Sequence, residues 1–235
     1  MNLKSKTMVT LAMLATASIG LSNTAFAAGP PKGSTGVGWA LKYNTKGAWN
    51  LKHNFTYTVK FVNTDSRTKS TPYLKNTVAY LNAMPEMKKA KTKFVLSSTV
   101  VGTTHYNTKN WCGNGYGTIV FVLKYRPFQG KKNYSMAHPC YHLANNSAFG
   151  GYVEMNSEYW LTKNKTTAWT YAVRNIHAHE LGHMLGLGHP DARYFSKNEA
   201  TPIMHVPTGG YKSSNAGKYP AADTRGIRRL ISNGS

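Results

Sequence analysis

Three histidines and one glutamate occur together in the segment His179-Glu180-Leu181-Gly182-His183-Met184-Leu185-Gly186-Leu187-Gly188-His189. His179 and His183 are four residues apart, so on a helix both imidazoles project from one face, as two ligands of a single zinc ion require. Gly186 can adopt a positive φ, which lets the chain leave the helix and return His189 to the metal as a third ligand. This spacing predicts a zinc site with an open fourth position.

Glu180 follows the first of these histidines and would lie beside an ion bound between them. Zinc with three protein ligands lowers the pKa of a bound water to about 7, and a neighbouring carboxylate can take the proton as the water attacks a carbonyl. The pattern therefore predicts Glu180 as the general base and then as the proton donor to the leaving amine. The alternative interpretation is a histidine-rich helix end without a metal.

The residues before the motif favour the helix that it needs. Thr166 or Thr167 can cap such a helix, and apolar residues recur at helical spacing up to the histidines, at Ala168, Ala172 and Ile176. His177 precedes His179 by two residues and projects from a different face, so we expect it to be exposed or beside the site rather than a ligand.

The pattern His179-Glu180-x-x-His183-x-x-Gly186-x-x-His189 resembles the zinc signature of the metzincin clan of metalloproteases. The resemblance implies that Met204, in Thr201-Pro202-Ile203-Met204-His205, is the Met-turn methionine beneath the zinc ligands. The layout is closest to matrixin-like (M10-type) catalytic domains, with a serralysin-like Pro190 after the third histidine. The clan implies an α/β (α+β) zincin-like fold: a mixed twisted sheet with an active-site helix, Met-turn and C-terminal helix.

The remaining pattern is compatible with that order of elements. Alternating apolar residues predict strands over 54–62, 93–101, 117–124 and 150–156, a helix capped by Ser70 or Thr71 that ends before Pro85, and a final helix capped by Asp223. The resemblance implies that the last strand forms the sheet edge along which the substrate lies, through Gly151, Tyr152, Val153 and Glu154. The alternative is an ordinary strand without substrate contact.

Further metal ions have weaker support in the sequence. His138 and His142 are four residues apart, but no carboxylate or cysteine at suitable spacing accompanies them, so we interpret them as surface histidines rather than a second metal site. Calcium sites need several hard oxygen ligands, and the chain has 8 acidic residues, so we expect no calcium. Asp191 and His205 are candidates for contacts with the zinc ligands.

The first residues have the pattern of a secretory signal peptide. Lys4 and Lys6 precede an apolar run over 8–21, and Ala25-Phe26-Ala27 supplies a cleavage site. The sequence therefore predicts a signal peptide over 1–27, a flexible segment over 28–50 and a catalytic domain over 51–235, in a secreted protein. The alternative is a transmembrane anchor, which the short and interrupted apolar run disfavours.

Two cysteines remain in the exported chain. An even number in an oxidising compartment favours a disulfide between Cys112 and Cys140, and the alternative is a pair of free thiols.

The net charge of +21 predicts attraction to anions. For a secreted protein we expect an anionic cell-wall polymer or another polyanion as partner, against the alternative of scattered solubilising lysines. No compact basic run and no nucleic-acid module supports specific nucleic-acid binding. The expected function is a monomeric, secreted zinc-dependent metalloendopeptidase acting on polypeptides. The alternatives are a zinc amidase acting on cell-wall peptides and a weakly active wall-binding protein.

Overall fold

The computed structural model describes residues 27–28, 40–41, 50–102, 117–125, 135–141, 147–161, 165–189, 199–205, 213 and 215–232. Within these ranges the main strands are β3 (Asn50–Leu51), β4 (Thr56–Phe61), β5 (Lys93–Val100), β6 (Thr118–Lys124), β7 (Met136–Tyr141) and β8 (Ser147–Asn156). The helices are α1 (Thr64–Ala83), α2 (Pro85–Lys89), α3 (Glu158–Leu161), α4 (Thr167–Leu185) and α5 (Ala221–Ser232). A separate antiparallel pair joins β1 (Ala27–Ala28) to β2 (Ala40–Leu41).

One mixed sheet organises the described residues, in the order β3-β8-β6-β4-β5. All of these neighbours run parallel to one another. Strand β7 is antiparallel to β8 and pairs with the side of β8 that faces away from β6. Strands β5 and β7 therefore lie at opposite edges of the sheet, and the expected mixed α/β fold is confirmed.

The predicted edge strand is wrong. Gly151 pairs with Ile119 of β6 on one side and with Pro139 of β7 on the other, and Tyr152, Val153 and Glu154 are flanked in the same way. These four residues are therefore interior to the sheet, and their backbone edges are occupied by neighbouring strands. The edge beside the zinc motif is β7, which the sequence did not indicate as a strand.

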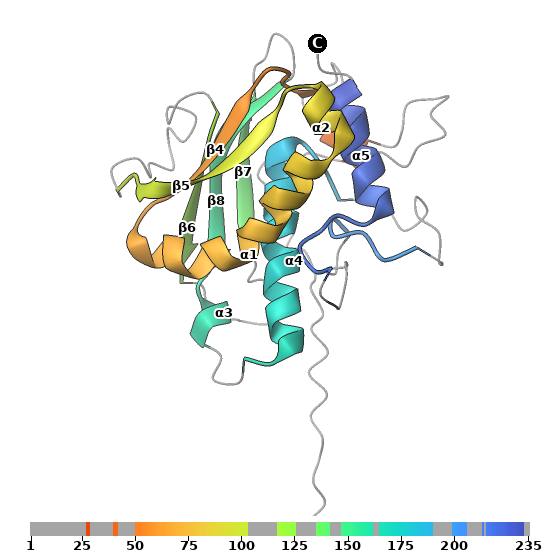
Figure 1. Ribbon diagram of the computed structural model, residues 1–235. Helices are drawn as coiled ribbons and strands as arrows, with labels where there is room; N and C mark the ends of the chain where they lie inside the picture. The colour runs from red at the N-terminus through yellow and green to blue at the C-terminus, as the bar shows by residue number, and fades with distance from the viewer. Residues whose placement is uncertain are drawn as a thin grey trace, which may run out of the picture.

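Helices α1 and α4 lie across the same face of the sheet (Figure 1), where alternate strand residues form the core with them. Tyr57, Phe61 and Phe121 are each 0% exposed at this interface. Residues of the opposite face form a second, smaller cluster of Val62, Val120, Val122 and Tyr152. Burial on both faces explains the nearly continuous apolar run of β6.

The predicted start of the first helix is also wrong. Helix α1 begins at Thr64, and the side chain of Asn63 caps it by accepting a hydrogen bond from the Ser66 N–H at 2.8 Å. Proline is favoured in the first turn of a helix, which made Thr71 a plausible cap before Pro72. Pro72 instead lies inside α1, at an exposed position where water can satisfy the carbonyl that its missing N–H leaves.

Helix α4 has the boundaries that the motif requires. The Thr166 hydroxyl accepts a hydrogen bond from the Trp169 N–H at 3.1 Å, which confirms Thr166 as the N-cap. At the other end Gly186 has φ 103°, the left-handed conformation that glycine adopts without a Cβ penalty. The chain thus leaves α4 at Gly186, within one turn of His183, as the spacing of the motif predicts.

Helix α5 begins at Ala221, so Asp223 lies in its first turn rather than at its cap. No helix among the described residues has both the length and the apolar character needed to cross a membrane. Strand β3 begins at Asn50, next to the predicted domain boundary, and residues 1–26 lie outside the described ranges.

Candidate metal centre

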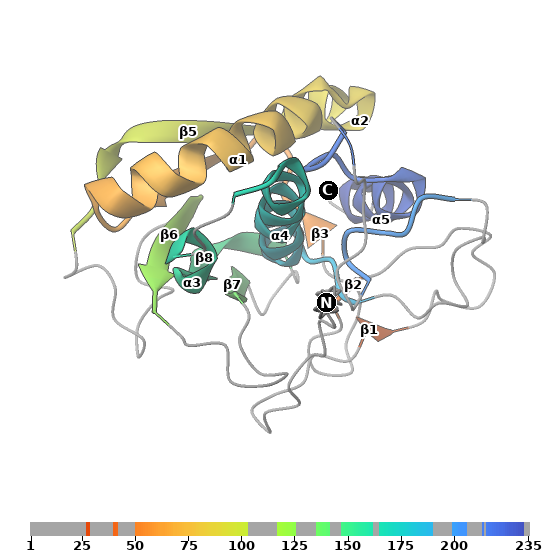
Figure 2. The same ribbon diagram turned by 90° about the horizontal axis from the view of Figure 1, so that it is seen from below.

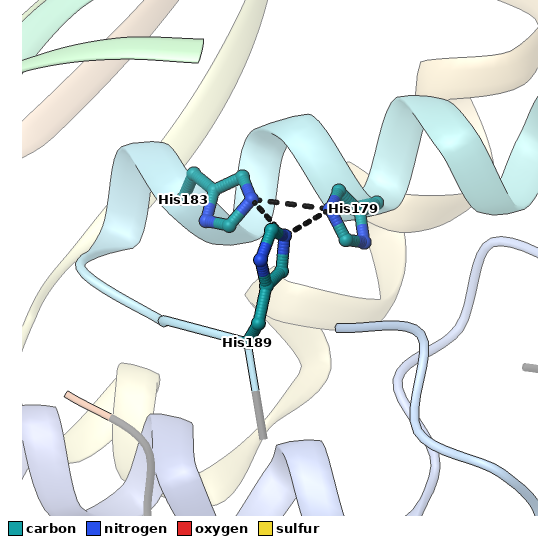
Figure 3. Close-up of side chains that lie close together, drawn as sticks. All are labelled: His179, His183 and His189. Atoms are coloured by element: carbon teal, nitrogen blue, oxygen red, sulfur yellow. Dashed lines mark hydrogen bonds between the residues drawn. The ribbon is translucent and has the colours of Figure 1, made fainter. Parts of the chain in front are cut away.

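The Nε2 atoms of His179, His183 and His189 converge on one point (Figure 3). They are separated by 3.0 Å for His179 and His189, and by 3.1 Å for each pair that includes His183. Two nitrogens that bind zinc at about 2.0 Å in tetrahedral geometry are about 3.3 Å apart, close to these separations. The described residues contain no other group of three metal-binding side chains this close together.

The opposite ring nitrogens are held by backbone carbonyls. His179 Nδ1 lies 2.7 Å from the Ile203 carbonyl oxygen, and His183 Nδ1 lies 2.7 Å from that of Leu187. Since a carbonyl can only accept, each Nδ1 must carry the proton, and each Nε2 then has a free lone pair. This arrangement fits a metal, because it fixes the tautomer and the orientation of both ligands.

The surroundings keep these imidazoles neutral, the form that binds a metal. Burial lowers the pKa of His179 to about 4. His189 is the exposed member of the three, and desolvation of its ring, then the neighbouring charges of His179 and His205, lowers the pKa of His189 to about 3. Burial, followed by the charges of His179 and His189, holds the pKa of His183 well below its usual range. The three side chains are therefore ready to bind a cation at neutral pH.

Glu180 is adjacent to this cluster in α4 and is 5% exposed. Burial raises the pKa of its carboxyl to about 8, and a hydrogen bond from the backbone N–H of Ala137 acts in the opposite direction. A cation between the histidines would also favour the charged carboxylate. The Ala137 contact brings β7, the edge strand, against the residue predicted to move protons.

Met204 lies directly beneath the motif helix, where it is 0% exposed. A Cβ built on Gly182 would be 2.4 Å from Met204 Sδ and 3.4 Å from the Tyr219 ring. Because Gly182 has no side chain, Met204 can pack directly against the backbone of α4 at this position. Met204 therefore packs against the helix that carries His179 and His183, and its role as the Met-turn methionine stays a prediction.

We expect Gly182→Ala to destabilise the fold by about 1–3 kcal/mol, as overpacking of a filled core does. Helix propensity alone predicts the opposite change, because replacing glycine by alanine in a helix interior stabilises the fold by about 1 kcal/mol. Denaturant unfolding at fixed zinc concentration measures the change. Gly182→Ala combined with Met204→Ala is the control: removal of the sulfur should recover part of the loss, and strictly additive losses would contradict the contact.

A buried carboxylate supports the loop that holds the ligands. Asp223 is 0% exposed, and its Oδ2 accepts a hydrogen bond from the Ile203 N–H at 2.6 Å. The carbonyl of the same residue, Ile203, accepts from His179. Asp223 in α5 is thus connected to a metal ligand through one residue of the Met204 loop. The sequence offered Asp223 only as a helix cap, because this contact spans 20 positions of the chain.

Asp223→Asn should destabilise the fold by about 1–2 kcal/mol, because a charge-assisted hydrogen bond becomes a neutral one. Zinc affinity should fall about 10-fold or more, as it does when partners of metal-ligating histidines are removed. Thermal unfolding with and without zinc separates the two effects. Unchanged zinc affinity together with unchanged stability would show that Asp223 does not support the ligand loop.

Other histidines have different environments. His177 is 0% exposed, which corrects the expectation of an exposed side chain, and it stacks on Tyr73 at 5.3 Å and on Phe121 at 6.2 Å. Burial lowers its pKa to about 4. His138 lies in β7 and stacks on Tyr152 at 4.2 Å. His142, Asp191 and Cys112 lie outside the described residues, so the predicted pairing of Cys112 with Cys140 stays a prediction.

The comparisons with known proteins agree with this geometry. Residues 121–231 match the family model of the matrixins, a span that begins in β6 and includes the three histidines, Met204 and α5. Among curated proteins no match to the chain is found. With three histidine nitrogens placed to hold one metal, the match makes this chain a zinc metalloendopeptidase whose residues 121–231 are of the matrixin family.

Proposed function

We propose that this chain is an exported endopeptidase in which His179, His183 and His189 hold the zinc and Glu180 moves the proton. The convergence of the three Nε2 atoms, with a buried carboxylate on the next residue, is the observation that supports it. Zinc in a three-histidine site lowers the pKa of a coordinated water to about 7 and polarises a substrate carbonyl.

Glu180 takes part in both proton transfers of the hydrolysis. Its carboxylate accepts a proton from the attacking water and then donates it to the nitrogen of the leaving amine. The Ala137 N–H holds the carboxylate in place, because it donates a hydrogen bond from β7. Burial supports this role, since a carboxyl whose pKa lies near neutrality can both take and return a proton.

The substrate lies along β7 in this proposal. Among the described residues β7 pairs only with β8, so its second edge is available to an added strand. Ala137 and Pro139 are two residues apart in β7, so their backbone groups face the same side of the strand. The Ala137 N–H donates to Glu180, and Pro139 has no N–H to donate. The edge therefore offers mainly carbonyl oxygens, which suit the N–H groups of an extended peptide.

Export is proposed from the sequence alone. The basic start, the apolar run over 8–21 and the Ala25-Phe26-Ala27 site support cleavage after residue 27. The proposed disulfide between Cys112 and Cys140 belongs to the same picture, because such bonds persist in oxidising compartments.

The test is cleavage of an unfolded protein such as reduced casein, with the products identified by mass spectrometry. The proposal expects cuts at internal peptide bonds and their loss when zinc is chelated. Purified cell-wall peptides are assayed in parallel. Release of wall peptides without any cut in casein would replace the endopeptidase by an amidase.

A further inference from the structure

One corner of the molecule, far along the chain from the zinc motif, concentrates positive charge. It is formed by the residues after β3, by α2 with the start of β5, and by the last turns of α5. We define this basic corner by seven side chains: Lys52, Lys88, Lys89, Lys91, Lys93, Arg228 and Arg229. Over residues 52–56, 85–93 and 226–232 the one carboxylate is Glu86.

Backbone contacts fix the three segments to one another. The Asn54 N–H donates to the Ala90 carbonyl at 2.8 Å, and the Lys93 N–H donates to the Phe55 carbonyl at 3.0 Å. The Thr92 hydroxyl donates to the Lys52 carbonyl at 2.6 Å. These bonds connect residues 52–55, which follow β3, to residues 90–93, which join α2 to β5.

The end of α5 is attached to the same corner. Arg228 Nε lies 2.7 Å from Glu86 Oε1, and His53 Nε2 lies 2.7 Å from the carbonyl oxygen of Ile231. The ion pair uses the single carboxylate of the corner. The net charge of the corner is therefore +6, from seven cations and one anion.

The lysines themselves point to solvent. Lys88, Lys89, Lys91 and Lys93 are exposed, while Met87, Ala90, Thr92 and Phe94 between and beside them are buried. Among the described residues, none of these four ammonium groups has a carboxylate within ion-pair distance. Lys91 has φ 53°, the left-handed conformation that often follows a helix end, and here it closes α2: the Lys91 N–H donates to the Lys88 carbonyl and the Thr92 N–H to the Met87 carbonyl, each at 3.0 Å.

The α2 and β5 part of the basic corner lies away from the β7 edge, a position that suits a tether. Strand β5 and strand β7 form opposite edges of the sheet, and Figure 2 shows α2 and β5 on the upper side with β7 below. A partner held by the lysines of α2 and β5 would leave the β7 edge and the histidine cluster accessible. Binding and cleavage can therefore occur together.

We propose that the basic corner binds a flexible polyol-phosphate polymer of the cell wall and holds the exported peptidase there. Lysine ammonium groups bind phosphates as point charges without a fixed fork geometry, which suits a mobile chain. A single flexible polymer can follow three segments around a corner, whereas duplex DNA is straight over about 150 base pairs. Proteins that bind single-stranded nucleic acid stack its bases on exposed aromatic side chains. The aromatic ring placed among these cations, Phe55, lies under the Lys52 ammonium at 4.7 Å.

The experiment measures binding of the purified protein to immobilised poly(glycerol phosphate) over a series of salt concentrations. The corner variant is Lys88→Gln, Lys89→Gln and Lys93→Gln. The matched control is Lys75→Gln, Lys165→Gln and Lys218→Gln, which removes the same charge from α1, the segment before α4 and the segment before α5. We expect the corner variant to bind about 10-fold or more weakly, with a shallower salt dependence, and the control to bind within about twofold of the parent.

Cleavage of a soluble peptide separates this proposal from the peptidase activity. The corner variant should cut it at the parental rate, because its substitutions are in α2 and at the start of β5, outside the histidine cluster and β7. Equal weakening of both variants would show that net charge alone attracts the polymer, and that result, like unchanged binding of the corner variant, overturns the proposal. So would tighter binding to duplex DNA than to poly(glycerol phosphate) at the same salt.

Discussion

Glu180→Gln is expected to lower kcat/KM for peptide cleavage by about 10²–10⁴-fold while the zinc content stays at one per chain. Glutamine has nearly the same volume and keeps an oxygen that can accept the Ala137 N–H, so the buried contact with β7 survives. It has no carboxylate to take or return a proton. The three histidine nitrogens are untouched, which is why metal binding should persist.

The measurement is the cleavage rate of a fluorogenic peptide together with metal analysis of the same preparation. Glu158→Gln in α3 is the matched control, since it makes the same chemical change outside the histidine cluster. It should cleave at the parental rate. A Glu180→Gln protein with parental turnover would remove Glu180 from the reaction.

His183→Ala has the second large expected effect, the loss of zinc and of activity together. One of three nitrogens that converge within 3.1 Å is removed, and an alanine supplies no ligand in its place. Zinc affinity should fall about 10³-fold or more, since structural zinc sites share about 10–16 kcal/mol among their ligands. Competition with a chromogenic chelator measures the affinity, and circular dichroism checks that the fold remains.

His177→Phe provides the control in the same helix. His177 is buried against Tyr73 and Phe121, so a phenylalanine ring can replace it among aromatic neighbours. It is outside the group of converging nitrogens. This variant should keep its zinc, and if it lost zinc to the same degree as His183→Ala, the assignment of the ligands by geometry would be wrong.

The histidine cluster could be predicted from the sequence because its geometry is almost entirely local. An interval of four residues places His179 and His183 on one face of any helix, and Gly186 permits the left-handed turn that returns His189. The cap at Thr166 is equally local. No information about distant parts of the chain was needed for these positions.

The edge strand could not be predicted in the same way. Strand β7 contains Pro139 and has no clear alternation, so it is a strand only because β8 supplies its hydrogen bonds. The interior position of Gly151 and its neighbours follows from that pairing. Asp223 belongs to the same class, since its bond to Ile203 depends on how α5 packs against the Met204 loop.

The most direct test of the central claim is a zinc titration of metal-free protein with peptide cleavage as the readout. We predict no cleavage after chelation, and full recovery at one zinc per chain with a sharp end point. Cleavage that persists at the parental rate in protein shown by metal analysis to contain no zinc would contradict the assignment of His179, His183 and His189 as the catalytic metal site.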